Sequence, residues 1–164
     1  GHYMRSTPDP ELLEAFKTFL PHVEAGSEVL NWLEDAGNEA KFLAALPGLK
    51  ERAKTLVELL ESARYLWVRR PLDLDEKAAK ILNEEARGIL ARLLPAFEKL
   101  DVWSGEATEA AVRAFAEAEN LKLGKVAQPL RAALTGRSTS PGIFDVLDVL
   151  GRDESLARIR DQAG

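Results

Sequence analysis

Apolar residues recur at intervals of three and four along most of the chain, the spacing that places them on one face of an α-helix. This spacing predicts helices over residues 9–20 and 27–35, another that begins at Asn38, and a long helix from near Pro47 to just before Pro71. The apolar positions of the long helix are Leu49, Ala53, Leu56, Leu60, Ala63 and Trp67. A helix of a bundle core is the favoured interpretation of this continuous seam, and a coiled-coil face is the alternative.

Capping and breaking residues divide the rest of the chain into further helices. The expected N-caps are Asp9, Asp75, Asn83, Ser104 and Asp153. Pro95 is expected to kink or break a helix before Phe97. Residues 123–134 should be helical, with Gly136 as the C-cap, and Ser140 with Pro141 should begin the next helix. Because no segment alternates with a period of two, the sequence predicts an all-α fold of two helical subdomains, residues 1–70 and 71–164.

Composition restricts the chemistry. The 164 residues carry a formal net charge of −5, with two histidines and no cysteine, which excludes thiol catalysis, cysteine-bound zinc and disulfides. No apolar run approaches the roughly 18 residues that span a bilayer, and no signal peptide opens the chain. The acidic balance argues against sequence-blind nucleic-acid binding but permits a local basic face.

Residues 121–147 are that local exception. They carry Lys122, Lys125, Arg131 and Arg137, and no acidic residue occurs from position 120 to 144. A basic pair of helices punctuated by Gly and Pro is a plausible site for a phosphate backbone or an unpaired base. The alternative is that these residues only cap two helices.

No catalytic or metal-binding constellation is recognised. Acid pairs such as Asp73 with Asp75 stand at expected helix starts, where carboxylates favourably meet the helix dipole. His22 is a lone histidine in a loop, and the tryptophans are expected to belong mainly to the core. On its own chemistry the chain is therefore not expected to be an enzyme.

The segment GKVAQPLRAALTGRSTSPGIFDVLDVLG, residues 124–151, closely resembles the C-terminal anticodon-binding region of bacterial glutamyl-tRNA synthetases. Residues 46–82 resemble the helical subdomain that precedes it, and GHYMR at the start is similar to the segment that leaves the stem-contact region. The resemblance implies a cytoplasmic class I ligase that attaches glutamate to tRNA using ATP with Mg²⁺. Its two catalytic signatures do not occur in this chain, so the fragment is expected to hold no cofactor and no catalytic site.

The same resemblance assigns roles to individual residues. It implies that Arg131 contacts an anticodon base, and that Lys122, Lys125 and Arg137 contact tRNA phosphates. The segment expected to pack against and hydrogen-bond the anticodon bases comprises Ser140, Pro141, Ile143 and Phe144. The alternatives are a solvated Arg131, a Phe144 that only fills the core, and lysines that only confer solubility.

Arg52 is a further candidate, because the corresponding position in the family is reported to separate enzymes that charge only glutamate tRNA from relaxed ones. An arginine there favours the discriminating type, although the neighbouring Lys54 could take the role. The expected partner is tRNA(Glu), with tRNA(Gln) as an alternative, for a monomer that binds neither DNA nor membrane. The competing function is a helical protein-interaction module without an RNA role.

Overall fold

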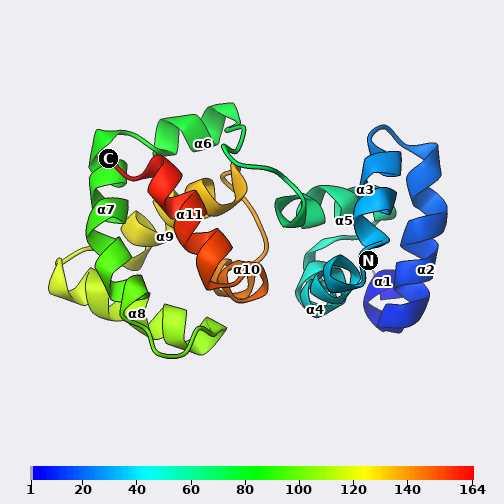
Figure 1. The fold of residues 1–164 in the computed structure, drawn as a ribbon, viewed down its shortest axis with the longest axis horizontal. Helices are drawn as coiled ribbons and strands as arrows, with labels where there is room; N and C mark the ends of the chain where they lie inside the picture. The colour runs from blue at the N-terminus through cyan, green and yellow to red at the C-terminus, as the bar shows by residue number, and fades with distance from the viewer. Residues whose placement is uncertain (1) are drawn as a thin grey trace. The chain divides into compact units, whose positions relative to one another are not determined.

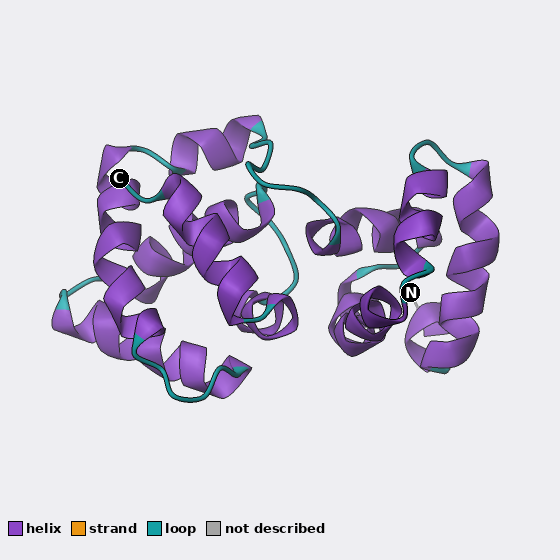
Figure 2. Ribbon diagram, in the orientation of Figure 1, coloured by secondary structure: helices purple, strands orange, loops and turns teal. Residues whose placement is uncertain are grey.

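The computed structural model describes residues 2–164, and the side chains from Met4 onward. Helices connected by loops make up the described chain, which contains no strand, so the predicted all-α class is confirmed (Figure 2). The chain divides into two compact units, a first that ends at Trp67 and a second that spans Val68–Gly164. The sequence placed this boundary after Arg70. Within the described range, no helix is both long and apolar enough to cross a membrane.

The first unit is a small helical bundle (Figure 1). Its elements are α1 His2–Ser6, α2 Asp9–Phe19, the 3₁₀ turn Leu20–His22, α3 Gly26–Leu33, α4 Ala36–Arg52, α5 Leu56–Ala63 and the 3₁₀ turn Arg64–Leu66. The rings of Phe16 and Phe42 stack with centroids 5.0 Å apart and are fully buried between α2 and α4. The carboxylate of Asp9 pairs with the ammonium of Lys50 at 2.7 Å, which ties the start of α2 to the end of α4.

The predicted long helix from Pro47 to Pro71 is wrong. Pro47 lies inside α4, which ends at Arg52, and Ala53 is extended with φ −82° and ψ 131°. The side chain of Thr55 then accepts a hydrogen bond from the N–H of Glu58 at 3.1 Å and begins α5 as its N-cap. The apolar seam therefore crosses a break between two helices, because a threonine cap competes locally with helix continuation.

Two predicted caps in the first unit are also corrected. Asp35, rather than Asn38, caps α4, since its carboxylate accepts from the N–H of Asn38 at 3.1 Å. Asp9 is the first residue of α2, after Pro8, and its carboxylate is held by Lys50 instead of by a helix N–H.

The second unit packs five helices around α9. Its elements are α6 Glu76–Ile81, α7 Glu84–Glu98, α8 Gly105–Ala118, α9 Leu123–Thr135, α10 Ile143–Leu150 and α11 Arg152–Gln162 (Figure 1). The apolar face of α9, including Val126, Leu130 and Leu134, is fully buried. The predicted N-caps Asp75, Asn83 and Ser104 are confirmed, as is the C-cap Gly136, which has φ 74°.

Three predicted boundaries in the second unit differ from the structure. α7 continues through Pro95 to Glu98, because buried Leu93 and Phe97 on either side hold the helix against its neighbours. α10 begins at Ile143 with Gly142 as N-cap, two residues after the predicted start. α11 begins at Arg152 rather than after Asp153, since Gly151 with φ 83° ends one helix and opens the next.

A buried arginine joins distant parts of the second unit. Arg158 in α11 is 2% exposed. Its guanidinium donates to the carbonyl of Leu134 at 2.7 Å, to that of Val68 at 3.3 Å, and to the carboxylate of Glu154 at 2.7 Å. These bonds connect α11 to the last turn of α9 and to the first residue of the unit.

Candidate functional site

The predicted site centres on α9 and the turn that follows it. Arg131 lies on α9 and Ser140 lies in the turn, and the structure brings them together: Nε of Arg131 donates to Oγ of Ser140 at 3.0 Å. Oγ of Ser140 in turn donates to the carbonyl of Pro141 at 2.7 Å. Arg131 is half-buried, so its guanidinium plane is fixed against the turn instead of being freely solvated.

Local hydrogen bonds shape this turn. The left-handed Gly136 donates its N–H to the carbonyl of Ala132 at 2.9 Å, and its own carbonyl accepts from the N–H of Asp75 at 3.0 Å. The hydroxyl of Thr135 donates to the carbonyl of Arg131 at 2.8 Å and accepts from the N–H of Arg137 at 3.2 Å. The chain reversal that carries Ser140 is thus anchored to the segment before α6.

The apolar candidates differ in exposure. Pro141 and Ile143 are buried, whereas Phe144 in the first turn of α10 is half-buried and keeps part of its ring surface accessible. No side chain caps α10, and the first N–H groups of any helix have no partner within that helix. This end of α10 therefore presents backbone donors beside a partly exposed aromatic ring.

Arg137 already has an internal role. Its Nη1 donates to the carbonyls of Gly136 at 3.1 Å and Asp73 at 3.4 Å, and its Nε lies 3.9 Å from a carboxylate oxygen of Asp75. These contacts fasten the turn to the segment before α6. A phosphate contact by Arg137 stays a prediction, and its guanidinium would have to make that contact in addition to these internal bonds.

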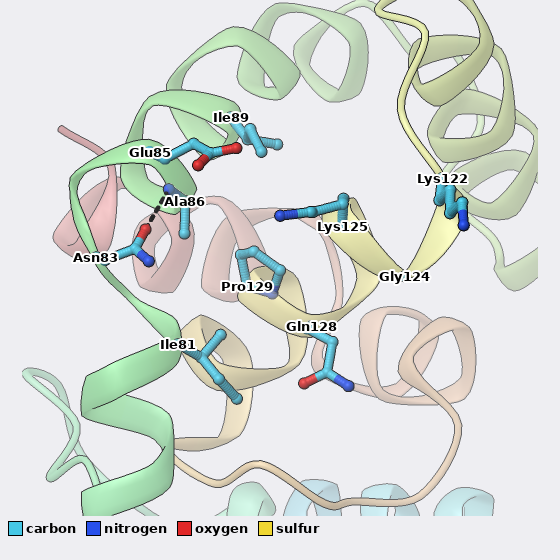
Figure 3. Close-up of a pocket in the computed structure, with 10 residues that line it drawn as sticks. All are labelled: Ile81, Asn83, Glu85, Ala86, Ile89, Lys122, Gly124, Lys125, Gln128 and Pro129. Atoms are coloured by element: carbon cyan, nitrogen blue, oxygen red, sulfur yellow. Dashed lines mark hydrogen bonds between the residues drawn. The ribbon is translucent and has the colours of Figure 1, made fainter.

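Lys122 and Lys125 lie at the start of α9 and are exposed. Neither ammonium forms a hydrogen bond or ion pair with any part of the chain that the structure describes. Both line a cleft of about 400 Å³ between the first turns of α9 and the helices α6 and α7 (Figure 3). Two positive charges without an internal partner are available to an anion.

Arg52 is the exposed last residue of α4, in the first unit, whereas the other predicted site residues belong to the second unit. Its neighbour Lys54 is also exposed, and the backbone N–H of Lys54 donates to the carboxylate of Glu58 at 2.8 Å. Arg52 therefore stands where α4 ends and the backbone becomes extended.

Sequence reasoning missed Gln128 and the residues that face it across the cleft. Gln128 is exposed, and its side chain has no hydrogen-bond partner within residues 2–164. Its spacing of three from both Lys125 and Arg131 was the available signal, because residues three apart are neighbours on a helix surface. Within the described residues, no group of three or more His, Asp or Glu side chains is arranged to hold a metal ion.

Comparisons with known proteins bear on the family of the chain. Residues 11–163 match the family model described as an anticodon binding domain. The whole chain is 58% identical to part of "Glutamate--tRNA ligase 1" of Brucella melitensis and of "Glutamate--tRNA ligase 2" of Brucella ovis, covering 34% of each. The chain thus spans about a third of the length of these curated relatives.

Solved structures show a similar helical fold. A glutamate tRNA ligase from Elizabethkingia meningosepticum superposes with a TM-score of 0.76 and 25% identity, over 98% of this chain and 30% of that one. The glutamate-tRNA synthetase of Elizabethkingia anophelis gives a TM-score of 0.72 at the same identity. The interpretation as a protein-interaction module without RNA is wrong, because the family match contradicts it and its apolar seam is broken at Ala53.

Proposed function

Because this chain belongs to the anticodon-binding domain family, we propose that it reads the anticodon of tRNA(Glu) as part of a ligase that attaches glutamate to that tRNA. The identity to the C-terminal third of such ligases supports the substrate. The observation that carries the proposal is the hydrogen bond between Arg131 and Ser140, which holds a planar cation in one orientation beside a turn.

The proposed mechanism of reading rests on unpaired bases. Anticodon bases are unstacked in the loop and present their edges and faces to a protein. A guanidinium with a fixed plane loses little entropy when it stacks on a base or donates to its edge. The accessible part of Phe144 offers an apolar face, and the first N–H groups of α10 offer donors.

Discrimination between tRNAs is assigned to Arg52 together with Arg131. An arginine can donate a forked pair of hydrogen bonds to a base, which rejects a base that lacks the matching acceptors. We propose that Arg52 favours glutamate tRNA over glutamine tRNA, acting in the cytoplasm where tRNA is charged. ATP and Mg²⁺ belong, in this proposal, to the two thirds of the ligase that this chain does not span, and no chemical step is assigned to its own residues.

The proposal is tested by measuring the affinity of the chain for glutamate tRNA and for variants with single anticodon changes. Arg131→Ala should weaken binding to the cognate tRNA by roughly 5- to 150-fold and relax discrimination at one anticodon base. Arg113→Ala is the matched control, since it removes an exposed guanidinium from α8 in the same unit. An equal loss for every tRNA after Arg131→Ala would leave a charge effect and refute the reading role.

Ser140→Ala separates positioning from contact. It removes the hydroxyl that holds Nε of Arg131 while leaving the guanidinium charge in place. We expect weaker binding of the cognate tRNA with an unchanged dependence of affinity on salt, because no phosphate contact is lost. A reduced salt dependence would contradict this assignment.

A further inference from the structure

The cleft beside α9 shares Lys122 and Lys125 with the predicted phosphate contacts, and its other lining residues have no role in the contacts described so far. It is lined by ten residues from three helices and the loops before α7 and α9: Ile81, Asn83, Glu85, Ala86, Ile89, Lys122, Gly124, Lys125, Gln128 and Pro129 (Figure 3). Its volume of about 400 Å³ lies in the range of clefts that hold small organic groups. All of its walls belong to the second unit, so its shape is fixed by the packing of α9 against α6 and α7.

The inner wall of the cleft is apolar. Ala86, Ile89 and Pro129 are buried, and Ile81 is half-buried at the end of α6. In Figure 3 the ring of Pro129 lies between Ile81 and the stem of Lys125. A flat apolar group inserted here would have one face packed against carbon atoms and thereby removed from water.

The rim of the cleft is polar and locally positive. Lys125 reaches from α9 toward the α7 wall, Lys122 lies at the far edge, and Glu85 is the one carboxylate among the lining residues (Figure 3). Two lysines and one glutamate give the lining a formal charge of +1, in a chain whose net charge is −5. This local excess favours a ligand that carries an anionic group next to a flat apolar one.

The cleft and Arg131 share helix α9. Lys125 and Gln128 are three residues apart on this helix, as are Gln128 and Arg131, so Gln128 neighbours both side chains on the helix surface. Six residues of helix between Lys125 and Arg131 correspond to about 9 Å. A nucleotide held in the cleft would therefore lie close along the strand to a base held at Arg131.

We propose that this cleft binds one unpaired nucleotide that flanks the anticodon in the same tRNA. Its base packs on Ile81 and Pro129, and its phosphates meet the ammonium groups of Lys122 and Lys125. The carboxylate of Glu85 only accepts hydrogen bonds, so it favours a base whose edge presents an amino or ring N–H donor. This inference rests on the proposed function, because it requires that the anticodon loop lies on Arg131.

The phosphate part is tested with the 164-residue chain and a fluorescently labelled anticodon stem-loop of glutamate tRNA. Lys125→Ala should weaken binding and reduce the slope of log affinity against log salt by about 0.7, the value for one phosphate of a single strand. Lys99→Ala is the matched control, since it removes an exposed lysine at the end of α7, outside the cleft. Equal slopes for the two variants would overturn the phosphate contact.

The base part is tested by removing one base at a time from the loop outside the anticodon. One abasic position should lower affinity for the native chain by roughly 5- to 150-fold, the usual loss for a stacked base. Gly124→Trp should abolish the effect of that position by filling the cleft mouth, because a Cβ at Gly124 meets nothing within 4 Å. Far-UV circular dichroism checks that this variant folds.

The outcomes distinguish the two proposals. If every abasic effect persists unchanged in Gly124→Trp, the cleft holds no base and the inference is refuted. If the native chain binds the cognate stem-loop and one with an altered anticodon equally, the proposed function fails instead. If the chain prefers the cognate anticodon but its affinity does not respond to Lys125→Ala or to any abasic position, the nucleotide-binding role of the cleft is refuted and the proposed function stands.

Discussion

Replacing Gly136 by alanine should destabilise the second unit and displace the turn that carries Ser140. Gly136 has φ 74°, a conformation that costs an L-residue about 1–2 kcal/mol. A Cβ at this position would lie 2.4 Å from the carbonyl oxygen of Asp73, which is backbone and must shift. That shift strains the bond from the N–H of Asp75 to the Gly136 carbonyl, adding about 1–3 kcal/mol as in other overpacked sites. The expected total loss is about 3 kcal/mol.

Two other glycines separate these contributions. Gly151 has φ 83° and ψ 172°, a conformation that is essentially restricted to glycine, but open space around its Cβ position, so Gly151→Ala should lose only a backbone part, about 1–3 kcal/mol. Gly124 has open space and helical surroundings, so Gly124→Ala should raise stability by up to about 1 kcal/mol through higher helix propensity. A glycine-to-alanine substitution is thus expected to lower the stability of the second unit at Gly136 and Gly151 and to raise it at Gly124.

The measurement is urea denaturation followed by circular dichroism, together with hydrogen exchange of the α9 amides, which reports opening of the second unit by itself. Gly136→Ala should also weaken binding of the anticodon stem-loop, because Ser140 moves away from Arg131. If Gly136→Ala lost less than about 2 kcal/mol, which is the upper end of the backbone cost alone, the close approach to Asp73 would contribute nothing, and the reasoning would be refuted.

Three further predictions concern other parts of the chain. Arg158→Met should destabilise the second unit by about 3 kcal/mol in the same denaturation assay, since it leaves two main-chain carbonyls without their donor; a loss below about 1 kcal/mol would contradict this. Thr55→Ala should lower the stability of the first unit by about 1 kcal/mol through loss of the α5 cap, and exchange of α9 amides should not change. A hydrogen bond to Glu39 raises the pKa of Lys17 above its ordinary value of 10.5. The stabilisation by this pair should therefore be complete below pH 10.5 and be lost as the pH rises through the raised pKa. A difference in Tm between the native chain and Lys17→Met that persists above the raised pKa would refute this.

Short-range signals in the sequence predicted much of the fold. Asp75, Asn83 and Ser104 were identified as caps because a cap needs only its own side chain and an N–H three residues on. The break at Ala53 was missed because the apolar spacing continues across it, and the Thr55 cap outweighs that spacing only in the folded unit. Pro95 was misjudged for the opposite reason, since burial of Phe97 favours a helix that local propensity opposes.

Some residues of the site are also predictable from short-range signals, and others are not. Arg131 and Ser140 were found because they lie nine residues apart in one recognisable segment, and the turn at Gly136 follows from its glycine. The cleft was not predictable, because Ile81 and Pro129 meet only through the packing of α6 on α9. Burial of Arg158 was equally hidden, since its partners Leu134 and Val68 are 24 and 90 positions away.

The bonds of Arg158 also set an order of events during synthesis. The guanidinium joins residue 158 to residue 68, and near the end of α11 Arg87 donates to the carbonyl of Gln162. Contacts between such distant residues close slowly, and none of them forms before the later residue has been made. A ribosome that has released residues 68–150 has therefore made α9 and its turn without the helix that secures them, and this stretch remains open to chaperones and proteases until α11 emerges.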